Sequence, residues 1–262
     1  MSVFKQACHF CSALLVTIIW VPCLMAHNKQ SPVKQENRLE LPQISDDDIL
    51  LNYTGFVVSY DSIRLIPKWV AYDLTDFEVA GDFPRSGNFG MDLNYQGAQA
   101  MREDYSYSGW DKGHMAPAAD MKWSQVAMYE SFYLTNVCPQ NHELNAGDWL
   151  ILENKVRYWA NKYKIAYIVC GPVFFDNAFG TIGMNHVSVP DGFFKAIVVC
   201  YNNSYHTIGF LFDNIPDRHN LAFYTITIND LETLTGMDLF TNIPDEVEEI
   251  VEDNIDYYFW EL

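Results

Sequence analysis

The chain has 262 residues, of which 49% are hydrophobic and 15% aromatic. This is ample apolar material for a folded core and excludes a disordered protein. The net charge is −18, and the sequence contains no zinc-finger spacing, basic helix or dense Lys/Arg run, which excludes the common base-reading DNA-binding motifs.

Residues 1–26 have the pattern of a secretory signal peptide. Lys5 is followed by the uncharged stretch "FCSALLVTIIWVPCLMA" over residues 10–26. Pro22 and the small Ala26 suit a cleavage region. We expect cleavage near Ala26 and a secreted or periplasmic protein with no stable membrane association afterwards. The alternative is a retained membrane anchor, although this stretch is at the lower length limit for a spanning helix.

Residues 27–50 are predicted to be a polar linker, rich in Gln, Asn and Pro and ending near an Asp46–Asp48 run. Residues 51–262 then read as one domain. Within it, alternating runs of β-branched and aromatic residues predict strands. The predicted strands cover 55–61, 67–74, 131–137, 164–174, 186–190, 193–201 and 206–212, with the last two joined in a hairpin by "NNSY".

Three helices are predicted. The first starts after Ser124 as N-cap, and the second covers residues 146–164. A third, acidic helix covers residues 245–261, with an apolar stripe of Val247, Ile250, Val251, Ile255 and Tyr258 at helical spacing. The stripe of the second helix consists of Trp149, Leu152, Val156, Trp159 and Tyr163. The fold class is therefore α+β, mixed, with a largely antiparallel central sheet.

The stretch "GWDKGHMAPAAD", residues 109–120, places His114 after a charged pair and before small apolar residues. Downstream, Asn145, Trp149 and Glu153 are spaced by four, which would align them along one helix. Two inward-facing oxygen ligands beside a histidine loop suit a hard divalent cation. The alternative is that Asn145 only caps the helix and Glu153 is half exposed.

The order of these pieces is informative: "DKGHMAPAAD", "FYLTNVCPQ", Asn145, Glu153 and "YIVCGPVF". In this order they resemble the DNA/RNA non-specific endonuclease family, the endonuclease G-like branch of the ββα-metal nucleases. The resemblance runs from about residue 57 to 240 and includes "FPRSGNFGMD" and "TINDLETLTGMDLF". One position departs from the family's Asp-Arg-Gly-His pattern: Lys112 stands in place of Arg and lacks its bidentate fork.

The resemblance implies a ββα-metal catalytic motif and a role for each matching residue. His114 would be the general base, with an ordinary pKa near 6.5 suited to neutral pH. Asn145 would be the direct ligand of a single Mg²⁺, for which Mn²⁺ could substitute, and Glu153 would act through the metal's water shell. Arg85, which would face the phosphate, and Asn136, which would orient the site, are the other expected catalytic residues. Arg85, Lys112 and Asp111 are expected to bind substrate, with Lys112 contacting phosphate and Asp111 also holding the loop.

The resemblance thus implies a secreted, metal-dependent endonuclease that cuts both DNA and RNA through backbone contacts. Between Arg85 and Lys122 the sequence has four basic and five acidic residues, so it shows no basic patch. Alternatives left open are a nucleotide phosphodiesterase, a non-catalytic nucleic-acid-binding relative and a secreted structural protein. A homodimer and an inhibitor partner are also left open.

Overall fold

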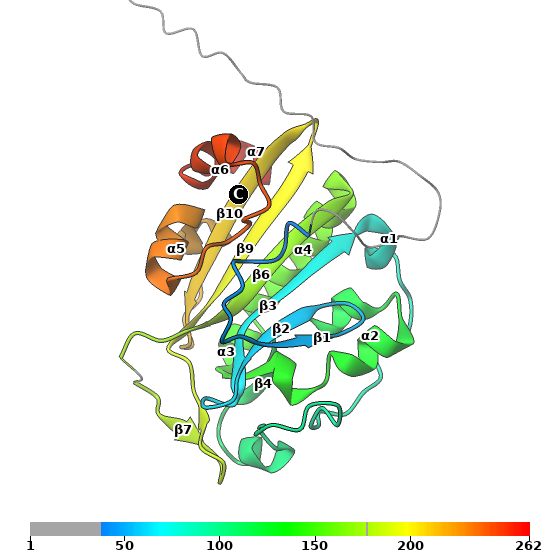
Figure 1. Cartoon of the computed structure of the whole chain (residues 1–262), viewed down its shortest axis with the longest axis vertical. Helices are drawn as coiled ribbons and strands as arrows, with labels where there is room; N and C mark the ends of the chain where they lie inside the picture. The colour runs from blue at the N-terminus through cyan, green and yellow to red at the C-terminus, as the bar shows by residue number, and fades with distance from the viewer. Residues whose placement is uncertain (1–37, 177) are drawn as a thin grey trace, which may run out of the picture.

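The computed structural model describes residues 38–176 and 178–262. The predicted signal peptide and the first part of the predicted linker lie outside these residues. The fold is α+β, as predicted, and is built on a seven-stranded antiparallel sheet (Figure 1). In spatial order its strands are β1 (Ile49–Asn52), β2 (Val57–Asp61), β3 (Ile66–Thr75), β6 (Ile165–Val173), β9 (Gly192–Tyr201), β10 (Ser204–Asp213) and β11 (Thr225–Ile226).

Two smaller antiparallel pairs accompany this sheet: β4 (Asp111–His114) with β5 (Val137–Gln140), and β7 (Thr181–Ile182) with β8 (Val187–Ser188). Short 3-10 segments cover Arg102–Tyr105, Ala118–Met121, Leu134–Asn136 and Leu221–Tyr224. The α-helices are α1 (Asp76–Val79), α2 (Gln125–Glu130), α3 (His142–Asn145), α4 (Asp148–Tyr163), α5 (Ile228–Thr235), α6 (Asp245–Glu252) and α7 (Tyr257–Trp260).

The sheet is covered on both faces, because its central strands are apolar on both sides. In β9, Phe193 and Ile197 belong to the core cluster that includes the stripe of α4, whereas Phe194 and Ala196 belong to the cluster that includes α5. This alternation follows from the two-residue period of a strand. The predicted stripe of α4 is fully buried, and Figure 1 shows α4 and α5 on opposite sides of the sheet.

Most predicted strands are present, and the β9–β10 hairpin turns at Asn202 and Asn203 with φ of 49° and 61°. Both values suit the type I′ turn, in which Asn is favoured. The strand predicted over 131–137 is wrong. Leu134–Asn136 form a 3-10 turn, and the strand begins only at Val137.

The single C-terminal helix predicted over 245–261 is also wrong. The chain forms α6 and α7 with a break between them, and Ile250 and Tyr258 of the predicted stripe are 67% and 93% exposed. The Asp256 side chain accepts a hydrogen bond from the Phe259 amide and so caps α7. The break lets Trp260, rather than the predicted stripe, enter the core.

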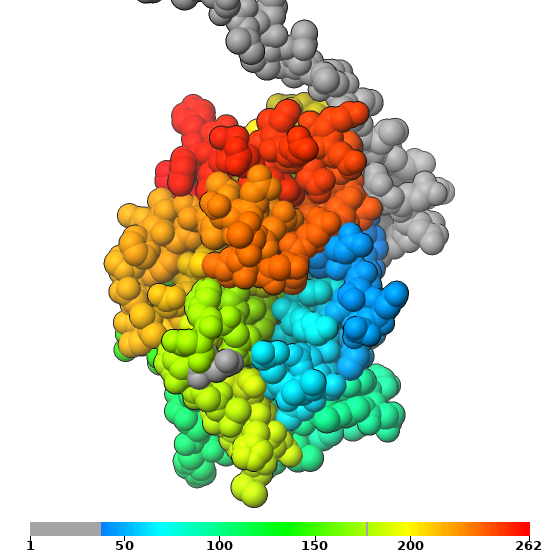
Figure 2. Space-filling view, turned by 60° about the vertical axis from the view of Figure 1, so that its left-hand side comes forward, coloured from blue at the N-terminus to red at the C-terminus, as the bar shows by residue number. Residues whose placement is uncertain are grey.

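Part of the predicted linker is packed against the domain. Leu39 and Glu40 are buried, and the Gln43 amide donates to the Asp238 carbonyl at 2.7 Å. Figure 2 shows this blue segment lying beside the orange C-terminal part of the chain. The structured part of the chain thus includes residues before 51.

Candidate active site

His114 is the last residue of β4, where it pairs with Val137 of β5. Its ring lies 4.9 Å from Phe89 and 5.1 Å from Phe132, centroid to centroid. The Nε2 atom is buried and has no hydrogen-bond partner among the described residues. Burial lowers the pKa of His114 to about 3, and the nearby charge of Arg85 adds to this effect. The imidazole is therefore neutral at neutral pH, with a pKa well below the ordinary value expected from sequence.

Asn136 holds the backbone that follows His114. Its side-chain oxygen accepts from the Ala116 amide, and its Nδ2 donates to the carbonyls of Ala116 and Ser131, each at 2.9 Å. Its own carbonyl accepts from the Met115 amide. Asn136 is fully buried and is not part of the pocket lining, so its place suits a positioning residue rather than one that touches substrate.

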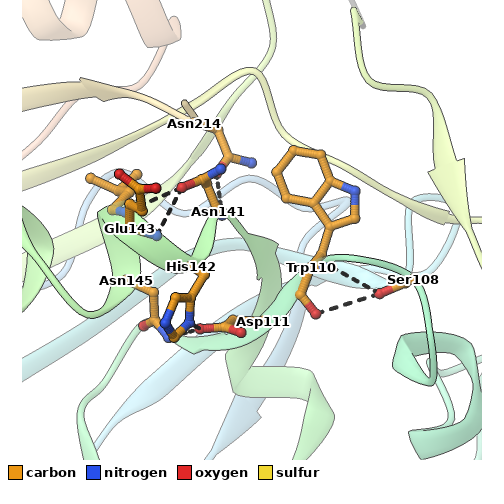
Figure 3. Close-up of polar contacts among 9 residues, drawn as sticks. Ser108, Trp110, Asp111, Asn141, His142, Glu143, Asn145 and Asn214 are labelled. Carbon is orange, nitrogen blue, oxygen red and sulfur yellow. Dashed lines mark hydrogen bonds and ion pairs between the residues drawn. The ribbon is translucent and has the colours of Figure 1, made fainter. Parts of the chain in front are cut away.

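Asn145 ends α3 and is fixed by Asp111, the first residue of β4. Asp111 Oδ2 accepts from Asn145 Nδ2 at 2.8 Å and lies 2.8 Å from His142 Nδ1 (Figure 3). Because the amide nitrogen of Asn145 is engaged by Asp111, the carboxamide oxygen is left for a ligand. Asp111 thus contacts Asn145 and also lines the cavity.

The expectation that Asn145 and Glu153 share one helix is wrong. Helix α3 ends at Asn145, and α4 begins after Gly147, whose φ and ψ are −113° and −111°. A Cβ on Gly147 would lie 2.2 Å from the Glu143 carbonyl oxygen, so this tight turn requires glycine. The turn nevertheless brings Asn145 and Glu153 to the same pocket.

Glu153 lies on α4 and is 8% exposed. Burial raises its pKa to about 7; Asp120 also raises it, while Lys195, Arg157 and Arg85 act in the opposite direction. The carboxyl group is therefore poised between its neutral and charged forms near neutral pH. A cation in the pocket would favour the charged form.

Behind Glu153 lies a layer of buried charge that the sequence did not reveal. Arg157 pairs with the fully buried Asp120, which also accepts a 3.0 Å hydrogen bond from Tyr72 Oη. Lys195 is fully buried in β9, with Nζ 4.5 Å from the ring centroid of Trp149. The only sequence signal was a lysine inside the apolar run "FFKAIVVC".

A cavity of about 450 Å³ brings together six of the predicted site residues: Arg85, Asp111, Lys112, His114, Asn145 and Glu153. Folding also supplies the basic groups that the sequence did not show as a patch. Lys112 Nζ lies 5.1 Å from the Tyr105 ring centroid, and burial lowers its pKa, with Arg102 contributing further. The guanidinium of Arg218, which was not predicted, lies beside Gly147 in the turn after Asn145.

The polar groups of this cavity fit a hard divalent cation. The Asn145 carboxamide oxygen and the Glu153 carboxylate are oxygen donors of the kind that Mg²⁺ prefers, and Mg²⁺ needs few protein ligands because it retains waters. Over residues 38–176 and 178–262, no group of three His, Cys, Asp or Glu side chains is arranged to hold a metal. Such a cation would therefore depend on Asn145, water and phosphate oxygens.

Comparison with known proteins decides the family. The sequence model of the DNA/RNA non-specific endonuclease family matches residues 37–246. The chain belongs to this family. The family prediction made from the order of the motifs is thus confirmed, and the β4–β5 pair followed by α4 supplies the ββα arrangement that the family resemblance implied.

Curated relatives of this family member include a protein named nuclease EXOG, mitochondrial, from Danio rerio. It is 35% identical over 72% of this chain and 60% of its own length. Human endonuclease G, mitochondrial, is 31% identical over 72% of this chain and 68% of its own length. The chain spans about 60% of the length of the first of these relatives.

A solved structure agrees with the family assignment. The crystal structure of the EndoG/EndoGI complex matches with a TM-score of 0.75 and 27% identity, covering 84% of this chain and 96% of that chain. Several relatives are named mitochondrial, whereas the leader predicts export. Among the helices in the described part of this family member, none is long and apolar enough to cross a membrane.

Proposed function

We propose that this chain is a metal-dependent, sequence-non-specific endonuclease that hydrolyses phosphodiester bonds of DNA and RNA. The observation that carries the proposal is the meeting of a neutral His114, the free carboxamide oxygen of Asn145 and Glu153 in one cavity with Arg85. His114 suits the role of proton acceptor, Asn145 and Glu153 suit a cation site, and Arg85 suits binding of the phosphate.

His114 takes a proton from a water molecule whose oxygen attacks phosphorus. The P–O3′ bond breaks, and the departing 3′-oxygen takes a proton from solvent, so the products are a 5′-phosphate and a 3′-hydroxyl. Because Nε2 is buried against aromatic rings, we assign the proton-accepting role to Nδ1. Arg85 and Lys112 stabilise the charge that develops on the phosphate oxygens.

A bound divalent cation would supply further positive charge at the phosphate and the leaving oxygen. Asn145 would hold it directly and Glu153 through its water shell, with Mg²⁺ as the proposed ion and Mn²⁺ as a substitute. Asp111 holds the Asn145 carboxamide in the orientation that presents oxygen. Asn136 keeps the backbone after His114 in place.

The central experiment compares His114→Ala with Asn145→Ala on plasmid DNA and RNA, with and without EDTA. His114→Ala should lower turnover by about 10²- to 10⁴-fold, as for a lost general base, and leave Mg²⁺ affinity nearly unchanged. Asn145→Ala should weaken Mg²⁺ affinity as well, so that added Mg²⁺ recovers part of the activity. The matched control is His186→Asn, because His186 is exposed and has a φ of 58° that Asn tolerates.

Full activity of His114→Ala, or an unchanged Mg²⁺ dependence of Asn145→Ala, would show that these roles are assigned wrongly. A nucleotide phosphodiesterase would cleave small nucleotide esters but leave plasmid intact. A non-catalytic binding relative would bind without cleaving either polymer.

We propose that the chain is exported from the cell cytoplasm through a cleaved signal peptide. Mitochondrial transit peptides are amphipathic and Arg-rich, whereas residues 1–26 contain one lysine, no arginine and a long uncharged stretch. Intact-mass analysis of exported protein should find a chain that begins near residue 27. Recovery of the protein only from mitochondria, or an exported chain beginning at Met1, would contradict this proposal.

A further inference from the structure

Trp110, the residue just before β4, lies at the candidate active site without being part of the chemistry described above. It lines the same cavity as Arg85, Lys112 and Asn145. The Trp110 amide donates to Ser108 Oγ at 3.1 Å, and the same hydroxyl lies 3.4 Å from the Trp110 carbonyl oxygen (Figure 3). The backbone of Trp110 is thus anchored, while its indole is only partly buried and projects from the loop.

A second aromatic side chain reaches this position from a distant part of the sequence. Phe179 lies in the segment between β6 and β7 and is 36% exposed. The rings of Trp110 and Phe179 have centroids 5.2 Å apart and planes at 68°, an edge-to-face pair. The next residue, Gly180, has a φ of 66°, and its carbonyl accepts from the Val189 amide, which fixes the turn that carries Phe179.

Trp110 shares the cavity with Arg85 and Lys112, and Phe179 packs against Trp110 from outside the cavity lining. Arg85 and Lys112 in the cavity suit the phosphate, and a base attached to the neighbouring sugar presents a flat π-face. An aromatic platform attracts such a face whatever the base. The chain has a net charge of −18, which opposes binding of a polyanion. Stacking of bases on aromatic rings does not depend on positive charge and would therefore help to bind nucleic acid.

We propose that Trp110 and Phe179 form a base-stacking subsite that takes an unpaired nucleobase next to the scissile phosphate. This inference rests on the proposed nuclease function and extends it to the form of the substrate. Bases within a duplex are already stacked on one another, whereas bases of a single strand are free to stack on protein. The subsite therefore favours single-stranded over double-stranded nucleic acid.

The test measures binding, so that it is independent of catalysis. A fluorescently labelled oligothymidine is titrated with the full mature protein in EDTA, and fluorescence anisotropy gives Kd for the wild type, Trp110→Ala, Trp110→Phe and Phe179→Ala. Loss of one stacked base corresponds to a rise in Kd of about 5- to 150-fold. We expect such a rise for Trp110→Ala, a smaller rise for Phe179→Ala and near wild-type binding for Trp110→Phe.

Two controls make the result specific to base stacking. Phe77→Ala removes a 78% exposed ring outside the cavity and should leave Kd unchanged. An oligonucleotide of the same length made entirely of abasic sugars should bind the wild type as weakly as it binds Trp110→Ala. A blunt-ended duplex without a single-stranded loop should bind the wild type and Trp110→Ala equally well.

Equal weakening of single-strand and duplex binding in Trp110→Ala would overturn the subsite, as would a Trp110→Ala protein that still distinguishes the abasic strand. Phe179→Ala alters an exposed loop residue and tests the idea even if Trp110→Ala fails to fold. Plasmid cleavage by the wild type is measured in parallel. If the wild type cleaves plasmid but Kd does not change when Trp110 or Phe179 is replaced, only the subsite is rejected. If Kd depends on these two rings but plasmid is not cleaved, only the catalytic function is rejected.

Discussion

At the scale of single residues, the geometry of the site depends on hydrogen bonds that orient one side chain or backbone segment through another. The Asp111 carboxylate accepts a hydrogen bond from the Asn145 carboxamide nitrogen, and we propose that this orients the carboxamide oxygen toward a cation. Asn136 acts in the same indirect way on the backbone after His114. Neither role follows from the chemistry of the residue type alone.

Replacing Asp111 tests this orientation. In Asp111→Ala the Asn145 carboxamide loses its partner and can rotate, so Mg²⁺ affinity should fall by about 10- to 100-fold, as for other residues that orient metal ligands. His142→Ala is the matched control, because His142 is the other, 73% exposed partner of the same carboxylate. Calorimetric Mg²⁺ titration of both variants measures the difference, and unchanged affinity in Asp111→Ala would contradict the orienting role.

Glu153 predicts a pH dependence of cation binding. Its pKa is raised to about 7, first by burial, so below pH 7 a cation must compete with a proton. Mg²⁺ affinity should therefore fall as pH is lowered below 7, by up to about tenfold per pH unit, and be independent of pH above this range. His114, with its pKa lowered to about 3, stays neutral throughout.

Titrations of Mg²⁺ at pH 6, 7 and 8 with the wild type and Glu153→Gln check this prediction. The glutamine variant cannot ionise at this position, so its affinity should not vary with pH over this range. The same pH slope in both proteins would show that another group controls cation binding.

At the scale of elements, the C-terminal helices illustrate how tertiary packing overrides a local pattern. The predicted continuous helix is interrupted so that α7 reaches the core. Trp260 there is fully buried, lies 4.7 Å from Trp159 of α4, and donates its Nε1 proton to the Thr207 carbonyl of β10 at 3.1 Å. One side chain thus joins the end of the chain to both the long helix and the sheet.

Removing this side chain should destabilise the protein strongly. Trp260→Ala leaves a large cavity and removes the hydrogen bond to the Thr207 carbonyl. About 3–5 kcal/mol is the usual loss in free energy of unfolding for such a cavity. Tyr258→Ala, a change of similar size at a 93% exposed position of the same helix, should alter stability by less than about 0.5 kcal/mol. Urea unfolding of the two variants measures the difference, and equal losses would mean that α7 is not held by Trp260.

At the scale of the whole molecule, negative charge is distributed unevenly. Two basic side chains, Arg85 and Lys112, line the candidate active site beside two carboxylates, whereas acidic side chains cluster around α5 and α6. There Glu252 is 3% exposed, and its Oε1 has no hydrogen-bond partner within the described residues. Burial, together with the nearby Glu232, Glu248 and Asp238, raises the pKa of Glu252 to about 9.

This cluster predicts that the protein loses stability in alkaline solution. The pKa of Glu252 is raised on folding from its ordinary value of 4.5, so the folded state binds this proton more tightly than the unfolded state does. Its stabilising contribution is complete below pH 4.5 and is lost as pH rises toward 9. Glu248, with its pKa raised to about 7 by burial first and then by Asp238, acts in the same direction.

Thermal unfolding at pH 5, 7 and 9 checks this prediction. The wild-type Tm should fall as pH rises, and Glu252→Gln, which keeps the neutral form at every pH, should reduce the fall. Glu246→Gln, at an exposed position of the same helix, is the control and should follow the wild type. Identical pH profiles for Glu252→Gln and the wild type would rule out this role.

The sequence by itself determined the family, the main strands and the long helix, and it predicted the principal site residues. Strand and helix periods are local properties, so "FFKAIVVCY" and the stripe from Trp149 to Tyr163 could be recognised without any knowledge of their partners. The order of motifs likewise predicted His114, Asn145 and Glu153 as site residues. Their presence in one cavity agrees with that prediction.

Only the tertiary structure decided which side chains meet. Asp111 contacts Asn145 across 34 residues, and Trp260 contacts Thr207 across 53. Such contacts depend on how the sheet and helices pack, and no local period encodes them. For the same reason the charge layer around Lys195 and the pairing of Trp110 with Phe179 became visible only once distant segments were placed side by side.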